Sequence, residues 1–227
     1  GNRAAVLTGV GRDSLGEFVM RDLSGKFNVD TSYVLQVEGG RTPVVLAGLD
    51  DPGEPEIVFY RDVDAPDTQI TLDVVPESVI RDVSVLWFTG SALSRDPSAS
   101  TIRSMLAIRD RAPHTIFDLD YRPSFWSSRA EATSVIGSAI SAATITIGNR
   151  DECSVALGMP ATTPPEEFAA EFLARGVSVA VVKRGADGVL VADASGMVTV
   201  PGIPVEVVCG LGAGDAFGGS FVHGLLS

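Results

Sequence analysis

The chain has 227 residues, of which 45% are hydrophobic and 20% charged, a composition typical of one packed α/β domain rather than a disordered segment. Its formal net charge of −12 repels polyanions and anionic lipid, so neither nucleic acid nor membrane is an expected partner. The apolar runs are too short to cross a bilayer, and the two cysteines lack the spacing of a disulfide framework or zinc site. We therefore expect a cytoplasmic protein.

Residues 30–67 carry a β-rich pattern. Three segments, YVLQVE, TPVVLAGL and EIVFYRD, are separated by GG and by DDPGEPE, which predicts antiparallel strands connected by turns. Such an insertion beside an α/β core fits a lid or a dimer interface. An extension at the edge of the main sheet fits the pattern equally well.

From residue 76 onward, helical and β-rich patterns alternate. Helices are predicted over 76–82, 98–111, 128–142 and 164–176, each followed by a short strand, over 83–90, 114–120, 143–149 and 177–185. This alternation predicts βαβ units and a mainly parallel sheet covered on both faces. Ligands of such sheets bind beyond the carboxyl ends of the strands, so chemistry is expected at 89–90, 118–122, 149–152 and 183–188.

The glycine-rich stretch CGLGAGDAFGG spans residues 209–219. It fits neither a dinucleotide loop nor a Walker loop, because the third glycine is out of register and no Gly-Lys-Ser/Thr follows. Instead, a predicted strand over 205–208 leads into a helix whose apolar face repeats every four positions, at Phe217, Phe221 and Leu225.

The first turn of that helix predicts an anion site. Gly212, Ala213 and Gly214 let the backbone approach an anion closely, and the unpaired amides at a helix N-terminus favour negative charge. Asp215 would then accept a proton from an attacking hydroxyl during phosphoryl transfer. Alternatively, Asp215 only caps the helix and the glycines serve tight packing.

Four segments in order resemble the ribokinase-like (PfkB) carbohydrate kinases: GVGRDSLGEF, NRDE, VVKRGADGV and GAGDAF. The resemblance spans nearly the whole chain. It implies a three-layer α/β/α fold with a mainly parallel central sheet and a small β lid, with residues 1–29 and 68–227 as the kinase core and 30–67 as the lid. It also implies that N- and C-terminal segments of the family fold lie outside this sequence.

The resemblance implies a role for each matching residue. Asp215 falls on the catalytic base, and Gly212, Ala213 and Gly214 on the anion hole. Asn149 and Glu152 fall on the pair that organises Mg²⁺ through water, and Asn149, Lys183, Gly185 and Gly188 fall on nucleotide-binding positions. Taken alone, the same residues also fit an ordinary N-cap with an acidic first turn, and a charged strand end followed by a glycine turn.

The segment FDLDYRPSFW resembles the D-x-N-x-R segment of 2-keto-3-deoxygluconate kinases. With Asp120 in place of asparagine it is more similar to the 5-dehydro-2-deoxygluconokinases of inositol catabolism. By this resemblance Arg122 and Asp120 would bind the substrate, and Arg61 would approach the acid end of the sugar. An arginine fork suits carboxylate or phosphate, but arginines paired with Asp62, Asp64 or Asp120 are the alternative.

The chain departs from the family pattern just before GAGD. The family often has Asp-Thr there, which supports a monovalent cation, whereas this chain has Cys209 and Gly210. The loss of a hard oxygen ligand argues against K⁺ activation. For Cys209, a small buried residue at a strand end is the expected reading, with a redox-sensitive thiol as the alternative.

These features together predict an enzyme that uses ATP and Mg²⁺ to phosphorylate a primary hydroxyl of a sugar acid, 5-dehydro-2-deoxygluconate. The alternative within the family is a 2-keto-3-deoxygluconate kinase. A non-catalytic protein that binds sugar or nucleotide is the alternative from another class, and a Rossmann oxidoreductase is disfavoured by the glycine register. A homodimer formed through the lid is a further expectation.

Overall fold

The computed structural model describes residues 3–48 and 55–227. Its internal contacts divide the chain into two compact units: residues 1–70 together with 205–227 form the first unit, and residues 71–204 form the second. Among the helices described, none combines the length and the hydropathy that a crossing of the bilayer requires.

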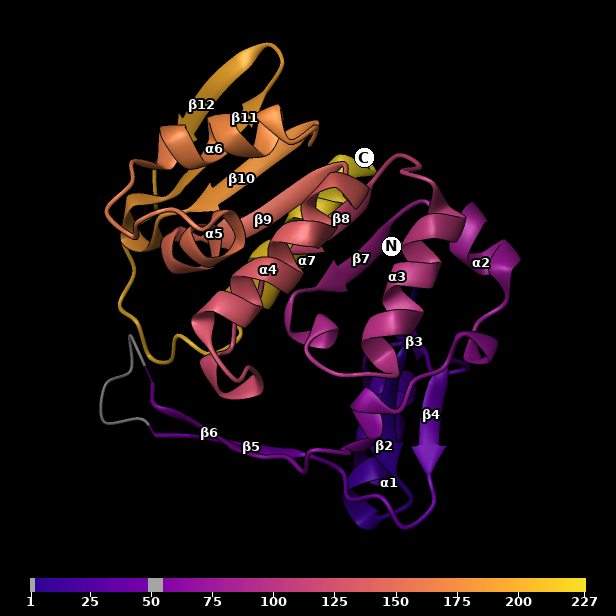
Figure 1. Ribbon diagram of the computed structural model, residues 1–227. Coiled ribbons are helices and arrows are strands. Elements are labelled where there is room, and N and C mark those ends of the chain that lie inside the picture. The colour runs from indigo at the N-terminus through magenta and orange to yellow at the C-terminus, as the bar shows by residue number, and fades with distance from the viewer. Residues whose placement is uncertain (1–2, 49–54) are drawn as a thin grey trace. The chain divides into compact units, whose positions relative to one another are not determined.

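The second unit is built around a six-stranded sheet in the order β12-β11-β10-β9-β8-β7 (Figure 1). Strands β7 to β10 are parallel, and β11 and β12 continue the sheet as antiparallel strands. This confirms the predicted mainly parallel sheet. The strands are β7 Leu86–Thr89, β8 Thr115–Asp118, β9 Ile145–Asn149, β10 Val179–Lys183, β11 Val189–Asp193 and β12 Gly196–Val200.

Helices connect the parallel strands, as the alternating pattern predicts. The α-helices of this unit are α2 Glu77–Asp82, α3 Ser98–Arg109, α4 Arg129–Ala139, α5 Arg150–Leu157 and α6 Pro165–Ala174. Short 3₁₀ turns lie at Leu72–Val74, Ser91–Leu93, Pro123–Phe125, Ile140–Ala142 and Gly185–Asp187. Side chains from α3 to α6 share one apolar core with Phe117 of β8 and Val182 of β10. Their strand neighbours Ile116 and Val181 face the opposite side and are also buried, as in a sheet covered on both faces.

The described part of the first unit holds three short strand pairs. β1 (Ala4–Ala5) pairs with β3 (Val29–Asp30) and β2 (Thr8–Gly11) with β4 (Val34–Val37), both in parallel, whereas β5 (Val44–Ala47) and β6 (Ile57–Tyr60) form an antiparallel pair. The prediction of antiparallel pairing is therefore wrong for YVLQVE, because α1 (Ser14–Arg21) and the π-helical turn Asp22–Lys26 form a crossover between β2 and β4. Most of the predicted turn over 50–56 lies outside the described residues, and the division into core and lid stays a prediction.

The glycine-rich stretch leads into α7 (Ala213–Leu225), where the predicted apolar repeat is confirmed. The rings of Phe217 and Phe221 stack with centroids 6.2 Å apart. The predicted strand over 205–208 is wrong, because these residues pair with no strand among those described and their side chains are exposed. Alternating sequence alone does not make a strand without a partner ladder.

Candidate active site

Three polar residues end three neighbouring strands of the second unit. Asp118 ends β8, Asn149 ends β9 and Lys183 ends β10. Lys183 lies opposite Asn149 in the parallel ladder, and Asp118 lies opposite Ile147. The carboxyl edge of this sheet therefore collects three of the ranges in which chemistry was predicted.

Asn149 and Glu152 form a capping box at the start of α5. The Asn149 side chain accepts from the Glu152 amide at 2.9 Å, and the Asn149 amide donates to Glu152 Oε2 at 2.5 Å. Lys183 Nζ lies 3.5 Å from the same Oε2, with the Glu152 side chain only 10% exposed. The structure therefore contains the ordinary N-cap that was the alternative for these residues. The same capping box places the Glu152 carboxylate next to Lys183.

The Asp118 carboxyl sits in an unusual electrostatic environment. Burial raises the pKa of Asp118 to about 6. Lys183 opposes this rise, whereas the carboxylates of Glu152 and Asp120 add to it. Asp118 is thus poised to change its charge near neutral pH, a property concentrated at functional sites.

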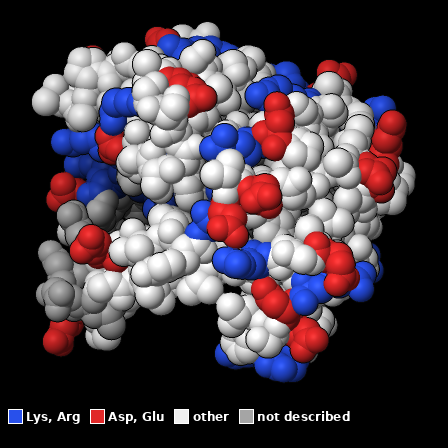
Figure 2. All heavy atoms as spheres, turned by 60° about the horizontal axis from the view of Figure 1, so that its bottom comes forward, with Lys and Arg blue, Asp and Glu red and all other residues white. Residues whose placement is uncertain are grey.

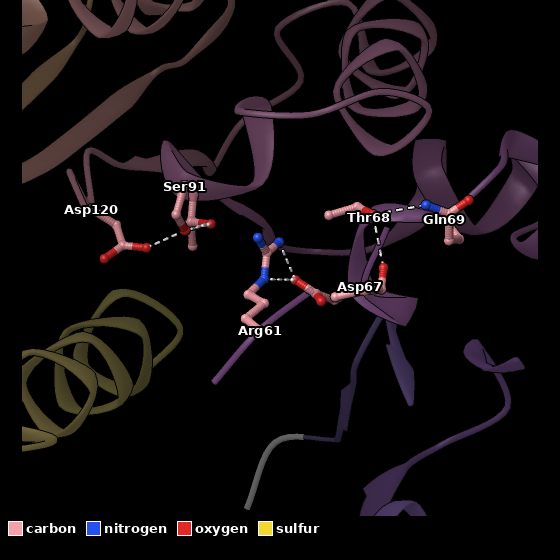
Figure 3. A network of polar contacts seen from close by, with 8 residues as sticks. Arg61, Asp67, Thr68, Gln69, Ser91 and Asp120 are labelled. Atoms are coloured by element: carbon pink, nitrogen blue, oxygen red, sulfur yellow. Dashed lines mark hydrogen bonds and ion pairs between the residues drawn. The ribbon is translucent and has the colours of Figure 1, made fainter. Parts of the chain in front are cut away.

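Asp120 connects the ends of β7 and β8. Its Oδ2 accepts a hydrogen bond from Ser91 Oγ (Figure 3), and its Oδ1 lies 2.8 Å from Arg122 Nε in an ion pair. The Ser91 hydroxyl is also 3.1 Å from Thr89 Oγ1. The alternative in which Arg122 pairs with Asp120 is therefore present in the structure.

The loop after β10 owes its shape to two glycines. Gly185 and Gly188 both have positive φ, at 60° and 87°, a conformation that favours glycine. A Cβ on Gly188 would lie 2.0 Å from the carbonyl oxygen of Val200, so no other residue fits there. Both predicted nucleotide-binding glycines thus shape the tight connection between β10 and β11.

In the first unit, the GVGRDSLGEF segment forms a half-buried turn that is held by the Asp13 carboxylate. Asp13 caps α1 by accepting from the Gly16 amide at 2.8 Å, and its carboxylate also binds the amide and hydroxyl of Thr42 at 2.8 and 2.7 Å. These hydrogen bonds, the Thr42 amide foremost, lower the pKa of Asp13. A Cβ on Gly16 would lie 2.1 Å from the Gly11 carbonyl oxygen, which explains the glycine at this spacing.

Arg61 pairs with Asp67, not with the predicted Asp62 or Asp64. Its Nε and one terminal nitrogen donate to Asp67 Oδ2 at 3.1 and 2.6 Å (Figure 3). The arginine side chain is 14% exposed. A carboxylate of the same unit therefore already neutralises this predicted substrate arginine.

The start of α7 differs in detail from the predicted anion hole. Gly212 is the N-cap, with φ of 80°. Because glycine has no side chain, the N-cap residue offers the first amides of the helix no side-chain acceptor. The Ala213 amide donates to the Gly210 carbonyl at 3.2 Å. Within the described part of the chain, no acceptor is found for the amides of Gly214 and Asp215. Asp215 is exposed in the first turn and is not the N-cap, so the capping alternative is not what the helix shows.

Cys209 is exposed. The expectation of a small buried residue at a strand end is therefore wrong. The correction has the same cause as the missing strand over 205–208: without a ladder partner the segment does not pack. Cys153, on α5, is the buried cysteine, and burial raises the pKa of its thiol.

The predicted site residues thus fall into two groups. The second unit brings together Asn149, Glu152 and Lys183, and separately Asp120 with Arg122. Arg61, Asp215 and the glycines of 212–214 belong to the first unit. Sequence reasoning did not single out Ser91 or Asp118 as site residues. Asp118 lies in the range 118–122 where chemistry was expected and is the first aspartate of the segment that resembles D-x-N-x-R, whereas the signal for Ser91 was its place directly after the predicted strand over 83–90.

Comparison with known proteins gives these residues a family context. The 5-dehydro-2-deoxygluconokinase of Geobacillus kaustophilus (strain HTA426) is 28% identical over 233 residues, which cover 100% of this chain and 68% of that protein. The protein of the same name from Bacillus velezensis (strain DSM 23117 / BGSC 10A6 / LMG 26770 / FZB42) is 30% identical over 231 residues, covering 100% of this chain and 69% of that one.

A solved structure shares the fold. The crystal structure of fructokinase from Vibrio cholerae O395, in its form with bound fructose, ADP and calcium ion, matches with a TM-score of 0.84 and 26% identity, covering 97% of this chain and 70% of that one. The ribokinase-like fold class is thereby confirmed. The model of the family described as pfkB family carbohydrate kinase matches residues 1–227. The chain therefore belongs to the pfkB family and is a carbohydrate kinase.

Proposed function

We propose that this kinase transfers the γ-phosphoryl group of ATP to a primary hydroxyl of 5-dehydro-2-deoxygluconate, an acidic sugar of inositol catabolism. The observation that carries the proposal is the similarity of the whole chain to proteins named for this activity. The Asp120 and Arg122 pair supports it, because aspartate at residue 120 is the feature by which FDLDYRPSFW resembles the 5-dehydro-2-deoxygluconokinases more than the 2-keto-3-deoxygluconate kinases.

In this proposal Asp215 accepts the proton of the attacking hydroxyl. Its exposure in the first turn of α7 leaves the carboxylate accessible to a substrate. The backbone over Gly212, Ala213 and Gly214 would stabilise the charge that develops on the transferred group, helped by the positive end of the helix dipole. Since the Ala213 amide already donates to Gly210, the amides of Gly214 and Asp215 are the better placed donors.

The polar edge of the second unit fits a nucleotide held with Mg²⁺. Glu152 Oε2 is engaged by the Asn149 amide and Lys183, and the described residues contain no cluster of His, Cys, Asp and Glu able to hold a metal alone. This suits an ion that keeps several waters and takes phosphate oxygens. Bound Mg²⁺ would neutralise phosphate charge. Asn149, Glu152 and Lys183, with the Gly185 and Gly188 loop, would orient the nucleotide.

The second candidate substrate is 2-keto-3-deoxygluconate, because FDLDYRPSFW is similar to the segment of those kinases as well. Both sugars carry a carboxylate and would use the same arginines. We also propose a cytoplasmic location and a homodimer formed through the lid. Exposed apolar side chains on β5 and β6, Leu46 and Tyr60 among them, support such pairing.

The test is ADP formation by the full-length protein with each of three acceptors: 5-dehydro-2-deoxygluconate, 2-keto-3-deoxygluconate and fructose. We expect kcat/KM for the first to exceed that for the second by at least about tenfold and for the neutral sugar by about a hundredfold, as selection by a buried charge contact allows. Preference for 2-keto-3-deoxygluconate would favour the second candidate. Preference for fructose would contradict the proposal of an acidic substrate.

A further inference from the structure

Four side chains at the ends of β7 and β8 form one connected chain. Thr89 Oγ1 lies 3.1 Å from Ser91 Oγ, Ser91 donates to Asp120 Oδ2, and Asp120 Oδ1 pairs with Arg122 Nε at 2.8 Å. Because the Ser91 proton is given to Asp120, the Thr89 hydroxyl is the donor to Ser91. Each hydrogen bond in this network polarises the next, which strengthens the contact between Asp120 and Arg122.

Both carboxylate oxygens of Asp120 already have a protein partner. One oxygen faces Ser91 and the other faces Arg122, and its side chain is 18% exposed. A carboxylate so engaged has little left to offer a sugar hydroxyl, and it would repel a sugar acid. Asp120 therefore suits the orientation of Arg122 better than direct binding of an anionic substrate.

Arg122 keeps the part of its side chain that recognises anions. Its Nε is paired, whereas its terminal nitrogens have no acceptor among the described residues, and the side chain is 41% exposed. The two terminal nitrogens of a guanidinium can bind carboxylate or phosphate by two parallel hydrogen bonds. A guanidinium held at Nε presents this edge in one orientation, at a lower cost in side-chain entropy.

The backbone explains why residue 120 is aspartate or asparagine. Its φ is 27°, and these two residue types adopt positive φ more readily than other residues with a side chain. Of the two, only aspartate adds an ion pair with Arg122. With aspartate instead of the asparagine of the D-x-N-x-R pattern, the side chain of residue 120 therefore holds Arg122 more firmly.

We propose that Ser91 and Asp120 are positioning residues that orient Arg122 toward an oxyanion of the acceptor sugar, and through it determine the preference for acidic over neutral sugars. The proposal rests on the proposed function, since it requires an anionic acceptor. It adds Ser91 to the residues that serve the reaction and gives Asp120 an indirect role.

The test compares steady-state kinetics of the full-length protein and its Ser91→Ala, Arg122→Ala and doubly substituted variants on 5-dehydro-2-deoxygluconate and on a neutral sugar. We expect Ser91→Ala to raise KM for the sugar acid about fivefold, with a smaller effect on kcat and on the neutral sugar. In the Arg122→Ala background Ser91→Ala should have no further effect, because it acts through the arginine. Ser195→Ala, which removes an exposed serine–aspartate bond of 2.6 Å in the β11–β12 turn, is the matched control and should change nothing.

An unchanged KM in Ser91→Ala, or an equal rise with and without Arg122, would overturn the proposal. A second measurement is independent of the substrate: the Arg122 Nε resonance of ¹⁵N-labelled protein, assigned with Arg122→Lys. It should shift in Ser91→Ala and in Asp120→Asn but not in Ser195→Ala, and an unshifted resonance contradicts the positioning role. If the wild-type protein phosphorylates no sugar acid while the resonance shifts as expected, the proposed substrate fails and the contact chain to Arg122 stands.

Discussion

Asp118 is a carboxyl whose pKa the structure raises toward neutral pH. Its carboxyl lies at the end of β8, where burial, against the attraction of Lys183, raises the pKa from 3.8 to about 6. The folded state therefore binds more protons than the unfolded chain between these two values. The stability contributed by this group is fully present below pH 3.8 and is lost as the pH rises through about 6.

The variant Asp118→Asn, which is neutral at every pH, should therefore gain stability relative to the wild type as the pH rises. We expect its relative free energy of unfolding to be about 1 to 2 kcal/mol more favourable at pH 8 than at pH 4.5. Urea unfolding at both pH values measures this. Asp187→Asn, at an exposed carboxyl of the same unit, is the control, and an equal effect of Asp118→Asn at both pH values would contradict the account.

Side-chain partners at this scale were only partly predictable from the sequence. The Asn149–Glu152 capping box is a local pattern, and the structure has it. Arg61, in contrast, pairs with Asp67 instead of the nearer Asp62 or Asp64, because the strand end and the following turn decide which carboxylate comes within reach. The Asp118 shift depends on groups from three strand ends, so no local pattern reports it.

At the scale of the elements, Asn149 is predicted both to cap helix α5 and to bind the nucleotide, and a pair of variants can separate these two roles. Asn149 caps α5 and Ser128 caps α4, each by accepting a bond from the third residue of its helix, at 2.9 and 3.1 Å. Loss of either cap should cost about 1 kcal/mol in stability. Only Asn149→Ala should also raise KM for ATP, by about tenfold, if Asn149 orients the nucleotide.

Thermal unfolding and ATP-dependent kinetics of Asn149→Ala and Ser128→Ala together check this prediction. Equal losses of stability with an unchanged KM for ATP in both would reduce Asn149 to a structural cap. A higher KM for ATP in Ser128→Ala would mean that any destabilised helix disturbs the site, so the nucleotide role of Asn149 would lose its support.

Elements with strong periodicity were predictable, and those that depend on a partner were not. The apolar repeat of α7 and the alternation from residue 76 onward both match the structure. The segment 205–208 has a strand-like sequence but no ladder among the described strands, and β4 pairs in parallel where a hairpin was expected. Strand pairing is non-local, so composition and alternation alone do not determine it.

Across the whole molecule, charged side chains lie both on the surface and, in the case of Arg109, in the interior. On the face drawn in Figure 2, basic and acidic side chains lie next to one another in several places, which fits a solvated surface of mixed charge. In the interior of the second unit, Arg109 is only 4% exposed. It donates to the carbonyls of Ile80, Arg81, Val83 and Pro113, at distances of 2.7 to 3.1 Å.

Arg109 thus joins the end of α2, the approach to β7 and the turn before β8. Substitution by methionine keeps much of the volume but leaves four carbonyls, which are buried or partly buried, without this donor, so Arg109→Met should lower the free energy of unfolding by about 3 kcal/mol. Arg103→Met, at an exposed position of the same helix α3, should change it by less than about 0.5 kcal/mol. Chemical unfolding of both variants decides, and equal effects would contradict this role of Arg109.

The central claim is that Asp215 accepts the proton of the acceptor hydroxyl, and Asp215→Asn tests it most directly. We expect kcat with the preferred sugar acid to fall by about 10³-fold or more, while the Kd for ATP measured by calorimetry stays within about twofold of the wild type. Glu206→Gln, at an exposed carboxylate in the segment before α7, should leave both unchanged. An Asp215→Asn variant that keeps more than about a tenth of the wild-type kcat would contradict the claim.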